Sequence, residues 1–128
     1  MRYLVVLEGN APATPPPAAL MEGIMKLGEE AARAGVMLDN GGLAPSAAGA
    51  LVSADATGVT ITDGPFAESK EMISYSLYDT RTKEEAVEWT RRFMALHAEH
   101  WPEWTGEARV LKVMGPEDFA APPAGVPS

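Results

Sequence analysis

The sequence predicts an α+β domain in which two helices cover one face of a mainly antiparallel sheet. Strand-like and helix-like segments follow one another in the order strand, helix, strand, hairpin, strand, helix, strand. The chain has 128 residues, 46% of them apolar, and can bury one hydrophobic core of ordinary size. We expect one domain over residues 1–114 and a tail rich in Pro, Ala and Gly over residues 115–128, either mobile or laid on a neighbour.

The first predicted elements are a strand over residues 2–8 and a helix that begins near Pro16. Apolar residues lie on both sides of the strand, so both of its faces must be covered. The helix has an apolar stripe with a 3.6-residue period, formed by Leu20, Ile24, Leu27, Gly28 and Ala31. Gly28 in this stripe predicts a close approach of helix to sheet, and Gly35 is placed to end the helix in the left-handed conformation.

The middle of the chain reads as three strand segments. A short strand over residues 36–43 is interrupted by a bend at residues 39–42, and residues 50–54 and 58–62 form a hairpin. In the next strand, residues 72–78, apolar positions alternate with the more polar side chains Ser74, Ser76 and Tyr78. We expect this polar side to face a cavity.

The last predicted elements are a helix and a strand. Thr82 and Glu85 have the spacing of a capping box, which fixes the start of the helix. Its apolar stripe continues to His100 or Trp101, where Pro102 stops it, and the final strand covers residues 107–114. Because two helices shield only one sheet face, we expect the other face to pair with an identical sheet in a homodimer.

Composition excludes several classes of partner. A net charge of −8 and an isoelectric point near 4.7 argue against nucleic-acid and anionic-membrane surfaces. The chain has no cysteine, and its amino terminus reads as a strand, not as a signal peptide, so we expect a cytoplasmic protein. Since no phosphate-binding loop, nucleophile elbow or His-Glu-x-x-His motif occurs, no cofactor is expected.

The segment from Asp63 to Glu71 is the main candidate site. Gly64 and Pro65 restrict the backbone next to the Asp63 carboxylate. If burial beside Phe66 and proximity to Glu68 or Glu71 raised the pKa of Asp63, this residue would serve as a general base or acid, with Glu71 assisting. The alternative interpretation is that Asp63 caps its own turn.

Further candidates are Phe66, Lys70 and Tyr75 as ligand-binding residues. Lys70 could hold an anionic ligand, or it could belong to a solvated loop with weak ion pairs. The aromatic residues could line a ligand cavity or form core and dimer contacts; they are Trp89, Trp101, Trp104, Tyr75 and Tyr78. His97 and His100 could hold a metal with a third ligand or finish the edge of the core, and we expect no metal site.

Several blocks of the sequence resemble the YCII-related superfamily, in particular its DGPF branch. The matching blocks are residues 2–4, 41–45, 63–66, 67–71 and 83–89. The resemblance implies a ferredoxin-like fold whose sheets pair into a dimeric α/β barrel. A His and Asp pair has been proposed as the catalytic site of this superfamily; the sequence lacks its histidine near the start of the first helix, so only Asp63 can be carried over.

Two functions follow as hypotheses. The first is a dimeric protein that binds a small organic molecule, and that is an enzyme if Asp63 transfers a proton without a cofactor. The second is a non-catalytic ligand-sensing or accessory protein, linked to transcription regulation through a protein partner. Relatives in the DGPF branch are often encoded beside sigma factors, which is compatible with both.

Overall fold

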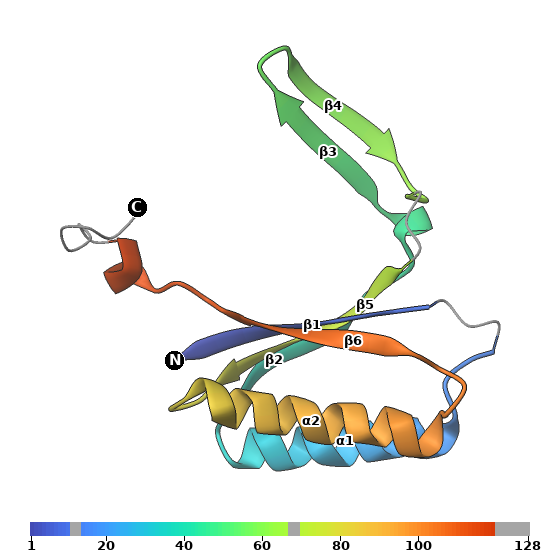
Figure 1. The fold of residues 1–128 in the computed structure, drawn as a ribbon, viewed down its shortest axis with the longest axis vertical. Helices are drawn as coiled ribbons and strands as arrows, with labels where there is room; N and C mark the ends of the chain where they lie inside the picture. The colour runs from blue at the N-terminus through green and yellow to red at the C-terminus, as the bar shows by residue number, and fades with distance from the viewer. Residues whose placement is uncertain (11–13, 67–69, 120–128) are drawn as a thin grey trace.

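A computed structural model describes residues 1–10, 14–66 and 70–119 of the chain (Figure 1). Its regular elements, in chain order, are β1 (Arg2–Gly9), α1 (Ala18–Arg33), β2 (Met37–Gly42), η1 (Ser46–Ala48), β3 (Ala50–Asp55), β4 (Gly58–Asp63), β5 (Glu71–Asp79), α2 (Lys83–His100), β6 (Gly106–Lys112) and η2 (Pro116–Phe119). The predicted order of elements is therefore confirmed.

Four strands form the main sheet, in the order β2, β5, β1, β6, and every neighbouring pair is antiparallel. With the β3–β4 hairpin set aside, this is the strand order of a ferredoxin-like fold. Both helices lie on one face of the sheet (Figure 1), as the sequence predicts. The β3–β4 hairpin forms a separate two-stranded sheet, which projects on the side away from the helices.

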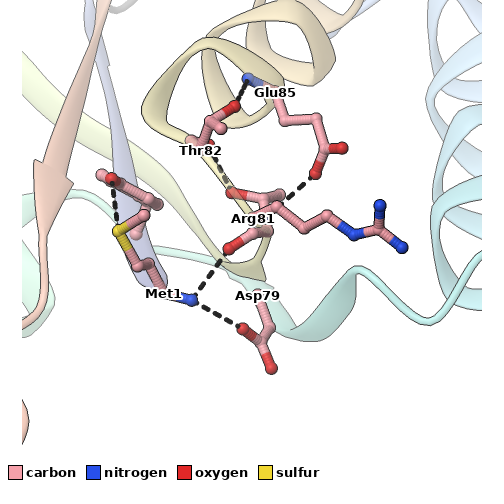
Figure 2. A network of polar contacts seen from close by, with 7 residues as sticks. Met1, Asp79, Arg81, Thr82 and Glu85 are labelled. Atoms are coloured by element: carbon pink, nitrogen blue, oxygen red, sulfur yellow. Dashed lines mark hydrogen bonds and ion pairs between the residues drawn. The ribbon is translucent and has the colours of Figure 1, made fainter.

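The ends of the helices follow local sequence signals. Gly35 has a φ of 74° directly after α1, which confirms its predicted left-handed conformation. At the start of α2, the Glu85 N–H donates to the Thr82 hydroxyl at 3.2 Å (Figure 2). The Glu85 carboxylate accepts from the N–H of Arg81 at 3.1 Å, one residue before the position that a capping box predicts.

The hydrophobic core consists of two clusters between the sheet and the helices. One contains Leu7, Leu20, Trp101 and Trp104, and the other contains Val5, Ala31 and Tyr78. The indole of Trp104 packs directly against two glycines, Gly9 and Gly106, which pair with each other across β1 and β6. A Cβ atom would stand 2.7 Å from the indole ring at Gly9 and 2.3 Å from it at Gly106. Larger residues at these positions would displace the indole.

Three details differ from the sequence predictions. The prediction of close packing at Gly28 is wrong, because a Cβ atom there would meet nothing within 4 Å. Strand β2 runs through the predicted bend at residues 39–42, with its irregularity between Met37 and Asp39 instead. The last strand ends at Lys112, and the tail begins with the short 3₁₀ helix η2, which ends at the exposed Phe119.

Candidate functional site

A cavity of about 790 Å³, open to solvent beside the exposed Met21 and Met25, lies between α1 and the β2–β5 half of the sheet. Its origin can be read from the strand register. Ser74 and Ser76 pair with the buried residues Leu7 and Val5 of β1, so they share the face that points toward the helices. They line the cavity together with Gly28 of α1. Small side chains on both sides leave this space unfilled, and the predicted cavity on the polar side of β5 is confirmed.

The cavity wall is mainly apolar. Its apolar residues come from α1, the strands and the end of α2, and include Met21, Ile24, Met25, Met37, Ile73, Phe93, Trp101 and Trp104. Both tryptophans are also buried core residues, with exposed fractions of 5% and 8%. The two interpretations of these aromatic residues, core and cavity wall, therefore both hold. Their rings stack at a centroid distance of 6.2 Å, and both residues line the cavity.

His97 places a polar group in this wall. It is only 5% exposed, and its Nδ1 lies 2.9 Å from the carbonyl oxygen of Phe93. The ring lies between Phe93 and Trp104, with centroid distances of 4.7 Å to each. Burial lowers the pKa of His97, so the imidazole is neutral near pH 7, with Nδ1 as the donor and Nε2 as an acceptor.

Glu71 lies at the start of β5 and also lines the cavity. Its Oε1 accepts from the Ser46 hydroxyl at 2.8 Å, and that hydroxyl accepts from the Phe66 N–H at 3.1 Å. The contact with residues 63–66 is tight, because a Cβ atom on Gly64 would stand 1.6 Å from the Ser46 carbonyl oxygen. Ser46 therefore joins Phe66 to Glu71, and of these three residues only Glu71 lines the cavity.

Asp63 lies apart from this group. It is the exposed last residue of β4, it is absent from the cavity wall, and its carboxylate makes no hydrogen bond or ion pair with any residue that the structure describes. It therefore lacks the enclosed environment of a general base, and no residue that the structure describes donates a capping hydrogen bond to it. The structure brings together Phe66 and Glu71, but it does not add Asp63 to them; Glu68 lies outside the described residues.

The side chains of Lys70 and Tyr75 make polar contacts with residues outside the cavity wall. Lys70 is exposed, and its Nζ lies 3.5 Å from a carboxylate oxygen of Glu107. The register pairs Tyr75 with Val6 and Gly41, so its side chain lies on the sheet face away from the helices, although the residue is also part of the cavity wall. Its hydroxyl donates to Asp39 at 3.1 Å, and this hydrogen bond raises the pKa of Tyr75.

The two histidines of α2 do not converge on a common point of coordination. His97 is turned toward the cavity, whereas Nε2 of His100 lies 3.9 Å from the Glu99 carboxylate. Over residues 1–10, 14–66 and 70–119, no three His, Cys, Asp or Glu side chains are grouped so that they could hold a metal ion. In the same segments, no helix is long and apolar enough to span a membrane.

Sequence reasoning missed two features of this candidate site. His97 follows Phe93 by four residues on the inner side of α2, a spacing that indicates a buried position but not a free nitrogen. Ser46 has no motif around it, and only the fold brings it to Glu71. In comparisons with known proteins, no family model and no curated protein sequence matches this chain.

Proposed function

We propose that this protein binds a small, mainly apolar organic molecule in the cavity between α1 and the sheet. The observation that carries this proposal is the cavity of about 790 Å³ that Gly28 of α1 borders together with Ser74 and Ser76 of β5. Ligand sites in proteins have volumes of roughly 300–1,000 Å³ and combine apolar walls with a few polar groups. This cavity has both properties.

A binding role, as in a ligand-sensing or accessory protein, is better supported than proton transfer by Asp63. An enzyme of that type needs its carboxylate next to the bound substrate. Asp63 is exposed and lies outside the cavity wall, and the carboxylate that does border the cavity belongs to Glu71. Membership of the YCII-related superfamily, which the sequence blocks suggest, is likewise a proposal.

The proposal includes a homodimer that forms through the sheet face away from the helices. Leu4 pairs with Leu77 and Leu111 across three neighbouring strands, and Val6 lies two residues along the same face. Leu111 is 48% exposed in the single chain. Burial of this apolar face against an identical sheet would satisfy the layer rule for both copies. Light scattering at micromolar concentration would reveal the dimer, and a monomer would contradict it.

The binding proposal is tested by titration with N-phenyl-1-naphthylamine, a neutral apolar dye whose fluorescence rises in apolar surroundings. We expect saturable binding with one dye per chain, and loss of this binding in Gly28→Leu, whose side chain would occupy the cavity. Ala19→Leu is the matched control, because it adds the same side chain to an exposed position of α1 outside the cavity wall. Equal binding by both variants would contradict the proposal.

A further inference from the structure

The cavity has a distinct distribution of charge. Its charged wall residues are Glu29 and Glu71, and no Lys or Arg belongs to the wall among the described residues. The Glu29 side chain is 66% exposed, with its carboxylate 3.9 Å from Arg33, whereas Glu71 is half-buried beside the apolar lining, where charges interact more strongly than in bulk water. An anionic group that entered the cavity would lose water and find no Lys or Arg among the described wall residues. A neutral molecule would avoid this cost, and a cationic group could lie near the carboxylates.

The cavity also has a free hydrogen-bond acceptor. Nδ1 of His97 is engaged with the Phe93 carbonyl oxygen, whereas Nε2 makes no hydrogen bond to any described residue. No fully buried side-chain nitrogen or oxygen lacks a partner over the described ranges. Nε2 must therefore reach accessible space, and His97 borders the cavity. A neutral imidazole nitrogen in this position accepts a hydrogen bond from an N–H or O–H group.

We infer that the ligands of this cavity are neutral or cationic apolar molecules with an N–H or O–H group that donates to Nε2 of His97. Arylamines, phenols and apolar alcohols have this chemistry, whereas carboxylates, sulfonates and phosphates do not fit the charge of the wall. This inference rests on the proposed ligand-binding function. It specifies the class of molecule that the site selects.

Three dyes with similar aromatic rings test the inference. N-phenyl-1-naphthylamine is neutral and has an N–H donor, 8-anilino-1-naphthalenesulfonate adds an anionic group, and 1-phenylnaphthalene lacks the amine. For each dye, the binding that Gly28→Leu abolishes is taken as binding in the cavity. We expect cavity affinity for the neutral amine to exceed that for the sulfonate by at least about tenfold at low salt, from Coulomb repulsion at about 6 Å.

Charge and hydrogen bonding are then tested separately. Glu29→Lys should reduce the ratio of the affinity for the neutral amine to that for the sulfonate several-fold. Glu22→Lys makes the same change on α1 outside the cavity wall and should leave this ratio unchanged. His97→Phe should weaken the binding of the neutral amine by about two- to tenfold and leave the affinity for 1-phenylnaphthalene unchanged. Thermal unfolding shows whether His97→Phe is folded, and the Glu29 comparison does not depend on it.

The outcomes distinguish a failure of the inferred ligand class from a failure of the proposed ligand-binding function. If no dye shows binding that Gly28→Leu removes, the proposed function itself fails. If the neutral amine and the sulfonate bind in the cavity with equal affinity, only the inferred ligand class is overturned. Equal effects of Glu29→Lys and Glu22→Lys would also overturn it.

A different observation, the exposed β3–β4 hairpin, supports a second inference. Val52 pairs with Ile61 and Ala54 with Val59, so one face of the hairpin is apolar over these two pairs, and the Ala50–Asp63 pair lies at its end. The three larger residues, Val52, Val59 and Ile61, are 62%, 67% and 70% exposed. Between Leu51 and Ala54 and between Gly58 and Thr62, neither strand has a charged residue or a proline, the features that protect exposed edges. An exposed apolar face of this kind is typical of a surface that packs against another protein surface.

We propose that this hairpin lies against a second copy of the chain in the proposed homodimer. It projects on the side of the sheet where the partner would pack (Figure 1). Strand spacings of about 4.8 Å and rises of about 3.3 Å give two paired four-stranded faces a total flat area of roughly 900 Å². Two reciprocal hairpin contacts raise this to roughly 1,700 Å², within the range of about 1,200–2,000 Å² for stable interfaces.

Light scattering and dilution experiments test the hairpin contact. The double variant Val52→Ser with Ile61→Thr should weaken the dimer by at least about tenfold, since each apolar side chain would be buried twice in a symmetric dimer. Leu51→Ser is the control, because Leu51 lies on the other face of the hairpin. A wild-type monomer would overturn the homodimer and this contact together. A wild-type dimer whose dissociation constant is unchanged in the double variant would overturn only the hairpin contact.

Discussion

Gly28→Ala is expected to stabilise the protein, although Gly28 lies on the inner side of α1. A Cβ atom added there would meet nothing within 4 Å, so no packing contact is strained. Glycine in a helix interior is about 0.8–1.0 kcal/mol less favourable than alanine. We therefore expect the free energy of unfolding to rise by about 1 kcal/mol. For a domain of this size, that corresponds to an increase in melting temperature of about 4 °C.

Urea denaturation with a constant m-value measures this change directly. Gly23→Ala is the matched control, because it makes the same substitution on α1 where a Cβ atom would lie 3.0 Å from Cδ2 of Leu96. There the gain in helix propensity is offset by crowding, and we expect a smaller increase or a net loss. If Gly28→Ala destabilised the protein by 1 kcal/mol or more, α1 would pack closely on the sheet at that point, and the reasoning behind the cavity would be refuted.

Three further predictions concern stability and packing. Ser46→Ala removes the partner of the Phe66 N–H and should lower the free energy of unfolding by about 1–3 kcal/mol in urea denaturation, whereas an unchanged midpoint would speak against the contact. Gly106→Ala would place a Cβ atom 2.3 Å from Trp104, so we expect altered tryptophan emission and a free energy of unfolding that is lower by about 1–3 kcal/mol. An unaltered emission spectrum and unaltered stability would argue against the packing of Trp104 on Gly106. Burial lowers the pKa of His97, so the unfolded chain takes up its proton more readily than the folded chain. Stability should therefore fall as the pH is lowered from about 7.5 through the unfolded value near 6.5, and His97→Gln should reduce this slope; an equal slope in both proteins would contradict the assignment.

Local signals predicted the elements of the fold because their causes are local. Thr82 caps the following turn, and Gly35 adopts a positive φ, whatever packs around them. The alternation of Ser74 and Ser76 with apolar residues likewise indicates a polar side of β5, because side chains alternate between the two faces of any strand. Gly28 was misinterpreted because an inner glycine accompanies either a close contact or a void. The distance from helix to sheet decides between these, and it depends on the whole core.

The candidate site was predicted only in part, for a similar reason. Residues 63–66 have a restricted backbone, but turn chemistry does not determine where the preceding hairpin points, and the hairpin leaves Asp63 exposed. Glu71 was expected to assist Asp63, whereas in the fold it is joined to Ser46. His97 reaches the cavity through the tertiary packing of α2. The sequence spacing indicated burial without showing which ring nitrogen stays free.

Methionine methyl groups provide the most direct test of the ligand-binding cavity. Met21, Met25 and Met37 line the cavity, whereas Met1 and Met114 are absent from its wall. In a protein labelled with ¹³C at the methionine methyl groups, saturation with N-phenyl-1-naphthylamine should shift the resonances of the first three residues and leave those of the other two unchanged. Unchanged resonances of the three cavity methionines at saturation would contradict the proposed binding site.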